Sequence, residues 1–179
     1  RCQYCDTEYA FSGGDWMNLD AILERVAANQ TRYVTVTGGE PLAQKPCLDL
    51  LAMLCDADYQ VSLETSGALD ISKVDSRVVK VMDIKTPGSG EESRNRLENI
   101  NCISEHDQLK FVICDERDYE WSRELLQRYD LNQRCEVLFS PSFEQLAATD
   151  LADWILRDGL PVRMQMQLHK LLWGNQPVK

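Results

Sequence analysis

Residues 33–41 read Tyr-Val-Thr-Val-Thr-Gly-Gly-Glu-Pro, a β-branched run that stops at two glycines. Such a run predicts a strand, because branched side chains pack well on a pleated surface. The glycines, Gly38 and Gly39, would let a ligand approach the backbone closely. Glu40 beside them offers a carboxylate to an amine. Taken alone, the segment is explained equally well by an ordinary turn.

Helical and strand patterns alternate along the rest of the chain. Helical spacing of apolar residues covers 18–28, 46–56, 116–129 and 143–158, and apolar, β-branched runs predict strands at 60–64, 78–84, 109–113, 136–139 and 162–168. Five or six βα units of this kind predict a parallel sheet covered by helices. The irregular stretch 86–96 predicts a mobile loop. We expect one domain over residues 1–179.

The composition excludes several classes of protein. The 179 residues carry a net charge of −10, and 44% of them are hydrophobic, which is ordinary for a globular domain. A nucleic-acid binder would need clustered Lys and Arg, which this sequence does not contain. It also has no apolar stretch of the length that a membrane span requires and no signal-peptide pattern. We therefore expect a soluble, cytoplasmic protein.

The cysteines divide into two groups. There are seven, and an odd number argues against a disulfide framework. Five are expected to pack as small apolar side chains: Cys47, Cys55, Cys102, Cys114 and Cys135. Cys2 and Cys5 form a C-x-x-C pair, which suits zinc, an iron–sulfur cluster or redox exchange. No second pair completes a zinc ribbon, and no helix pattern follows directly as in thioredoxins. A cluster held by three cysteines remains possible, with the third upstream of Arg1.

Polar residues recur where the predicted strands end. In parallel α/β folds ligands bind at the carboxyl ends of the strands. The candidate groups there are Glu64, Ser66, Asp83, Lys85, Ser140, Gln165, Gln167, His169 and Lys170.

The C-x-x-C pair, followed about thirty residues later by Thr-Gly-Gly-Glu-Pro, resembles the radical S-adenosylmethionine superfamily. Narrower segments resemble its 7-carboxy-7-deazaguanine synthase family: Cys5-Asp6-Thr7, 64–67, 83–90, 139–141 and 165–170. The resemblance implies an α/β fold, an incomplete TIM-like barrel of parallel strands with helices outside. Its first strand would be missing from the visible chain, which opens at Arg1 and is expected to be N-terminally incomplete.

The resemblance also implies an activity. It is a magnesium-dependent, radical carbon–nitrogen lyase reaction in queuosine precursor biosynthesis, which contracts the ring of 6-carboxy-5,6,7,8-tetrahydropterin with loss of ammonia. A reduced 4Fe–4S cluster would cleave S-adenosylmethionine to a 5′-deoxyadenosyl radical, which takes a hydrogen from C6 of the pterin. A flavodoxin-like or other one-electron donor and a homodimer are implied as partners.

Site roles follow from the same resemblance. Cys2 and Cys5 would bind the cluster and Thr7 the magnesium ion, while Thr37 and His169 would contact the substrate. The residues expected to bind S-adenosylmethionine are Tyr4, Asp6, Gly38, Gly39, Glu40, Glu64, Ser66, Asp83, Lys85 and Ser140. Two departures stand out: the third cluster cysteine is absent, and the chain continues past His169, so a substrate-capping terminal carboxylate is not carried over.

Two alternatives stay open at this point. A glycyl-radical activase shares the cluster and the Gly-Gly-Glu-Pro segment, although it is not expected to carry the Gln-Leu-His-Lys ending at 167–170. A non-enzymatic module would instead use Cys2 and Cys5 for zinc.

Overall fold

A single sheet of parallel strands organises the molecule. The computed structural model describes residues 1–5, 7–8 and 13–174. Its six strands are adjacent in sequence order, β1-β2-β3-β4-β5-β6, and every pairing is parallel. The strands are β1 (Tyr33–Val36), β2 (Gln60–Thr65), β3 (Val79–Ile84), β4 (Gln108–Ile113), β5 (Glu136–Pro141) and β6 (Arg163–Met164).

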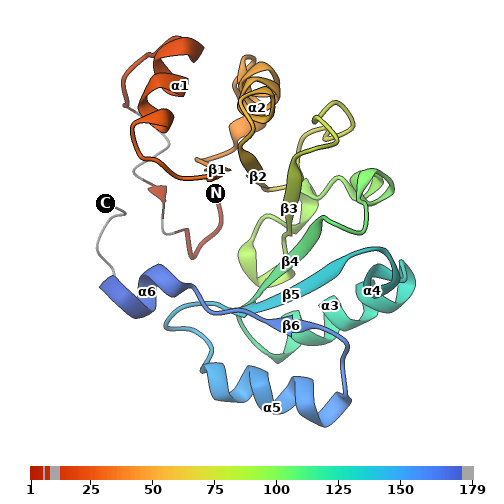
Figure 1. Ribbon diagram of the computed structural model, residues 1–179. Helices are drawn as coiled ribbons and strands as arrows, with labels where there is room; N and C mark the ends of the chain where they lie inside the picture. Colours follow the sequence, from red (N-terminus) through yellow and green to blue (C-terminus); the bar gives the residue numbers. More distant parts are fainter. Residues whose placement is uncertain (6, 9–12, 175–179) are drawn as a thin grey trace.

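Most of the helices lie along the outside of the curved sheet. The helices are α1 (Leu19–Ala27), α2 (Cys47–Asp56), α3 (Glu116–Arg128), α4 (Leu131–Arg134), α5 (Ala148–Asp158) and α6 (Leu168–Trp173). In Figure 1, α2 to α5 follow the outer side of the arc of strands, whereas α6 and the N-terminal residues lie on its inner side. Among the strands that the structure describes, β1 and β6 each pair on one side only, so the sheet does not close. The predicted α/β fold, an incomplete barrel of parallel strands, is confirmed.

Side-chain alternation separates the two faces of the sheet. In β2, Val61, Leu63 and Thr65 are buried while the residues between them are partly exposed. The strand β3 repeats this alternation, as expected when one face packs against helices and the other stays open. The inner face therefore remains available for polar groups and ligands.

The largest core cluster is built around aromatic side chains. Phe111 on β4 is fully buried, and its ring centroid lies 5.4 Å from that of Phe139 on β5 and 6.5 Å from that of Trp121 on α3. The interplanar angles of 61° and 66° are edge-to-face geometries that aromatic pairs favour. These contacts fix α3 against the middle of the sheet.

The prediction of a last strand over 162–168 is wrong in most of its length. Only Arg163 and Met164 pair with β5, and the amide of Gln165 adds one hydrogen bond to the Phe139 carbonyl at 2.9 Å. The chain then turns into α6, which places His169 on a helix instead of a strand. Alternating apolar residues predict the strand, but the chain leaves β5 after Gln165 because α6 begins at Leu168.

The helix predicted from residue 143 begins later, at Ala148. Glu144 adopts a φ of +62°, in the left-handed region that an α-helix excludes. The Ser142 hydroxyl donates to the Gln145 side chain at 2.9 Å and stabilises a turn there. The loop before α5 is therefore a hydrogen-bonded turn at the end of β5.

Most of the cysteines lie where the sequence places them. Cys47, Cys55 and Cys135 are buried in the two core clusters, and Cys102 packs partly against one of them. Cys114 is half-buried, and burial, followed by the Asp118 carboxylate, raises the pKa of its thiol to about 12. None of the described helices is long and apolar enough to cross a membrane.

We expect Phe111→Ala to lower the free energy of unfolding by about 3–5 kcal/mol, because it removes a fully buried ring and leaves a cavity. Trp16→Ala is the matched control, since Trp16 is 99% exposed and should change stability by less than about 0.5 kcal/mol. Urea unfolding of both variants measures the difference. Equal losses would contradict the assignment of Phe111 to the core.

Candidate functional site

The Glu40 carboxylate joins the ends of β1 and β2. It accepts hydrogen bonds from the Thr65 hydroxyl at 2.9 and 3.0 Å, the Ser66 amide at 2.8 Å and the Ser66 hydroxyl at 2.5 Å. The Leu42 amide adds a fourth donor at 3.1 Å. Glu40 and Ser66, both expected in the site, are therefore in direct contact. The carboxylate is held in one orientation, on the rim formed by the strand ends.

The second position after β2 requires a glycine, Gly67, because of its backbone conformation and its close neighbours. Its φ is +69°, and a Cβ atom there would lie 2.9 Å from Cγ of Met82 on β3. Glycine alone combines this conformation with this approach. The turn after β2 is thereby kept close to the end of β3.

The end of β3 carries an ion pair. The Lys85 ammonium lies 2.8 Å from Oδ2 of Asp83, and both side chains are largely buried. Burial lowers the pKa of Lys85, but the Asp83 carboxylate and then the neighbouring Cys2 raise it, so its net pKa is above the usual value. Lys85 is therefore a cation at neutral pH, next to a proposed cluster ligand.

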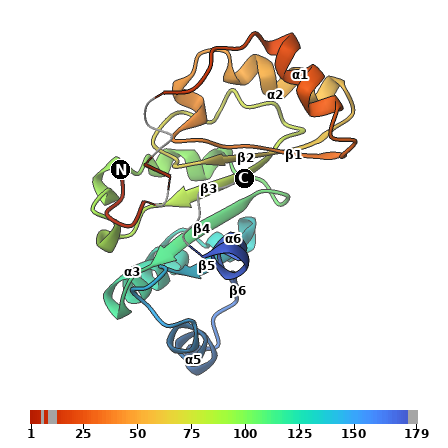
Figure 2. The ribbon, with the colours of Figure 1, turned by 90° about the vertical axis from the view of Figure 1, so that its left-hand side faces the viewer.

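The C-x-x-C segment forms a tight turn. The Cys5 amide donates to the Cys2 carbonyl at 3.0 Å, Cys2 is buried, and the Thr7 hydroxyl lies 3.5 Å from the Cys5 sulfur. The Gln3 amide donates to the Ser89 carbonyl at 3.1 Å, and Figure 2 shows this N-terminal turn beside the loop after β3. Among residues 1–5, 7–8 and 13–174, no three His, Cys, Asp or Glu side chains gather as a metal ion would require. Cys2 and Cys5 could serve as two ligands of an iron–sulfur cluster, and a third ligand would have to come from outside the described residues.

Several buried polar atoms on the rim lack a hydrogen-bond partner within the described part of the chain. They include the Tyr4 hydroxyl, Oδ1 of Asp83, Oγ of Ser140 and Oε1 of Gln165. Burial, followed by the Asp83 carboxylate, raises the pKa of Tyr4, so its phenol stays protonated. Unpaired buried polar groups are costly, and groups of them mark places where a ligand supplies the missing partner. A polar cofactor such as S-adenosylmethionine fits this requirement.

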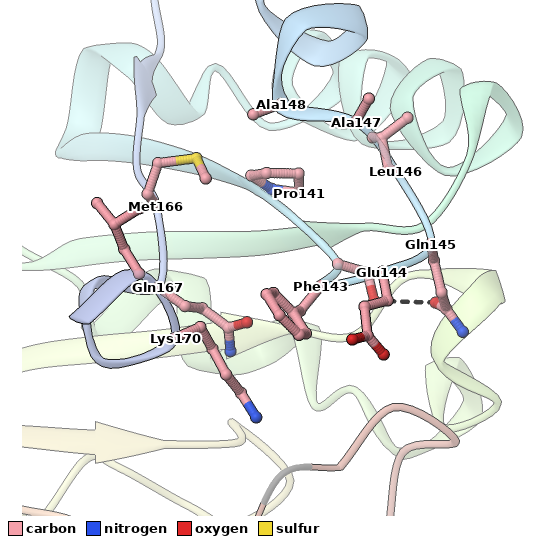
Figure 3. Close-up of a pocket in the computed structure, with 12 residues that line it drawn as sticks. Pro141, Phe143, Glu144, Gln145, Leu146, Ala147, Ala148, Met166, Gln167 and Lys170 are labelled. Atoms are coloured by element: carbon pink, nitrogen blue, oxygen red, sulfur yellow. Dashed lines mark hydrogen bonds between the residues drawn. The ribbon is translucent and has the colours of Figure 1, made fainter. Parts of the chain in front are cut away.

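A cavity of about 520 Å³ opens between the loop after β5 and α6. Figure 3 shows Phe143 and Lys170 in the lower part of the view, with Met166 and Pro141 above them. The Lys170 ammonium lies 5.3 Å from the centroid of the Phe143 ring, a cation–π distance. The neighbouring residue His169 is half-buried on the same helix.

Other predicted site residues do not take part in the hydrogen bonds and ion pairs described above. Thr37, Gly38 and Gly39 are exposed on the loop after β1. Glu64 lies on the inner face, where its carboxylate is 3.8 Å from the Lys110 ammonium. Asp6 lies outside the described residues.

Two residues for which the sequence predicts no individual role support the site. Thr65 holds Glu40 through its hydroxyl, as described above. The Asn95 side chain accepts from the Lys85 amide and donates to the Lys85 carbonyl, both at 2.8 Å. Sequence patterns do not reveal either one, because each acts through a partner distant in the chain.

We expect Glu40→Gln to lower the free energy of unfolding by about 1–3 kcal/mol, because an amide cannot accept from all four donors and leaves some unpaired. Glu24→Gln, on the exposed side of α1, is the control and should be neutral. Urea unfolding distinguishes the two. Identical curves for both variants would show that the Glu40 contacts are not needed for the rim.

Comparisons with known proteins agree with this geometry. Residues 1–82 match the Radical SAM superfamily. The chain is 43% identical to 7-carboxy-7-deazaguanine synthase of Chlorobaculum tepidum over 97% of this chain and 80% of that protein. It is 39% identical to the synthase of Koribacter versatilis over 97% and 83%. The crystal structure of QueE from Escherichia coli superposes with a TM-score of 0.62 at 18% identity, covering 93% and 79% of the two chains. This chain belongs to the 7-carboxy-7-deazaguanine synthase family of the radical SAM superfamily.

Proposed function

We propose that this chain converts 6-carboxy-5,6,7,8-tetrahydropterin to 7-carboxy-7-deazaguanine, with loss of ammonia. The observation that carries this proposal is the 43% identity to the Chlorobaculum tepidum synthase, which extends over 97% of the chain. The protein is accordingly a radical SAM lyase that uses an iron–sulfur cluster and S-adenosylmethionine. Residues 1–179 are proposed to form a single catalytic domain.

When bound, the cluster and S-adenosylmethionine supply one-electron cleavage and a 5′-deoxyadenosyl radical that removes hydrogen from the substrate. Cys2 and Cys5 would bind the cluster as thiolates, together with a third ligand from outside the described residues. Lys85 places a positive charge beside Cys2.

The rim offers complementary groups for S-adenosylmethionine. Glu40 would accept from the methionyl ammonium, and Ser66, already bonded to Glu40, fixes its orientation. Lys85 would pair with the methionyl carboxylate. The unpartnered hydroxyls of Tyr4 and Ser140 provide further hydrogen bonds. Asp6, Gly38, Gly39, Glu64 and Asp83 complete the proposed cofactor site.

Magnesium and substrate are assigned to the inner side of the rim. The Thr7 hydroxyl is a hard oxygen donor, and Mg²⁺ prefers such oxygens and fills its other positions with water and substrate. Its position 3.5 Å from the Cys5 sulfur would bring the ion next to the cluster. Thr37 and His169 are proposed to contact the pterin.

The proposed partners are a flavodoxin-like or other one-electron donor and a second copy of the chain. Family membership supports both. A dimer would also cover exposed apolar side chains of α6, such as Leu171 and Trp173, which are 72% and 55% exposed.

We predict that anaerobic reconstitution of the complete protein gives a brown iron–sulfur protein, and that Cys2→Ala and Cys5→Ala each abolish the cluster absorption. Cys102→Ala is the matched control, because Cys102 packs against the core and should leave the absorption unchanged. With reductant, S-adenosylmethionine and magnesium, the wild type should form the deazaguanine acid. Cofactor cleavage without that product would point to another substrate, and tight zinc binding without a cluster would exclude radical chemistry.

Thr7→Ala should raise the magnesium concentration needed for half-maximal rate roughly tenfold, equivalent to about 1.4 kcal/mol of lost binding. Thr7→Ser keeps the hydroxyl and should behave as the wild type. The measurement is the initial rate as a function of magnesium concentration. An unchanged curve for Thr7→Ala would remove Thr7 from the magnesium site.

A further inference from the structure

Asp118 is a buried carboxylate in the first turn of α3, and the cofactor and substrate assignments above do not use it. It is 1% exposed. Its carboxylate accepts from the Thr86 hydroxyl at 2.9 Å, the Gly88 amide at 2.7 Å and the Cys114 amide at 3.0 Å. Burying a carboxylate is costly unless its hydrogen bonds are made. These bonds tie α3 to the loop that follows β3.

Gly88 allows this contact because it has no side chain. A Cβ atom at this position would overlap the Asp118 carboxylate. The loop therefore approaches α3 more closely than any other residue would allow. Asp118 and Gly88 together set the position of the backbone at residues 86–90.

The same loop holds the C-x-x-C turn from its other side. The Gln3 amide donates to the Ser89 carbonyl at 3.1 Å, and the Gln3 side chain donates to the Gly88 carbonyl. Ser89 is fully buried, and its hydroxyl donates to the Thr86 carbonyl at 2.6 Å. A continuous path of hydrogen bonds thus runs from Asp118 through residues 86–89 to Gln3, which lies between Cys2 and Cys5.

We propose that Asp118 is a positioning residue that fixes the loop 86–90 and, through it, the C-x-x-C turn against the end of β3. The proposal rests on the proposed function for its catalytic meaning. Lys85, which directly precedes the loop and is paired with Asp83, meets Cys2 at this end of β3. A displaced turn would change the distance between the cluster and the groups that bind S-adenosylmethionine.

The first test needs no cluster. In metal-free, full-length protein, Asp118→Asn should raise the exchange rate of the Gln3 amide at least tenfold, measured by NMR. Gly88→Ala disrupts the contact between the loop and the Asp118 carboxylate from the side of the loop, and it should raise the Gln3 exchange rate in the same way. Asp107→Asn is the matched control. Asp107 lies directly before β4 and is as buried as Asp118, but its carboxylate pairs with the Lys80 ammonium and accepts from the Ser104 hydroxyl. Asp107→Asn should destabilise the protein without selective exchange at Gln3.

The second test uses the reconstituted protein. Asp118→Asn should bind normal amounts of iron. It should need at least tenfold more S-adenosylmethionine than the wild type to change the electron paramagnetic resonance spectrum of the reduced cluster. Asp107→Asn should need the same concentration as the wild type. Unchanged Gln3 exchange and an unchanged titration in Asp118→Asn would overturn the proposal. If the wild type itself forms no cluster, the proposed function fails, whereas Gln3 exchange still decides whether Asp118 positions the turn.

Discussion

The parallel direction of all six strands is the constraint on which the site depends. Each strand must be joined to the next by a connection that returns the chain to the same end of the sheet, so the loops that follow the strands gather on one rim. Glu40, Ser66, Lys85 and Ser140 reach that rim from four different strands. An open sheet also leaves the inner face accessible, and a cofactor and a substrate can lie side by side there. Radical SAM chemistry needs cofactor and substrate to be neighbours, because the radical must form next to the carbon from which it removes a hydrogen.

Buried charge is distributed differently at the two ends of the sheet. Near the starts of β3 and β4, the Lys80 ammonium lies 3.0 Å from the Asp107 carboxylate, which also accepts from Ser104. Both charges are compensated within the fold, as a purely structural pair requires. At the opposite end, Asp83 shares one oxygen with Lys85 and leaves the other unpartnered among the described residues. The incomplete pairing lies where a ligand is expected, and the complete pairing lies where none is.

The sequence predicts most of the strands, because each strand rests on local information. The run at 33–36 is β-branched, and Glu40 directly follows the glycines that end it. Local information fails where a distant partner decides the outcome. The alternation at 162–168 predicts a strand, but β5 pairs with only two of its residues. Asp118 looks like an ordinary acidic residue at a helix start; its contact with Gly88 exists because α3 packs against β4.

The Glu40 geometry restricts how an amine can bind. Its carboxylate already accepts from the Thr65 hydroxyl, the Leu42 amide and both donors of Ser66, and two oxygens have about four lone-pair directions. The two backbone donors are fixed by the fold, whereas hydroxyl protons rotate. An incoming ammonium can therefore take the place of a hydroxyl proton, which leaves Ser66 or Thr65 free to turn toward the ligand. The rim is built around Glu40, with hydroxyl protons that a bound amine can displace without moving the backbone.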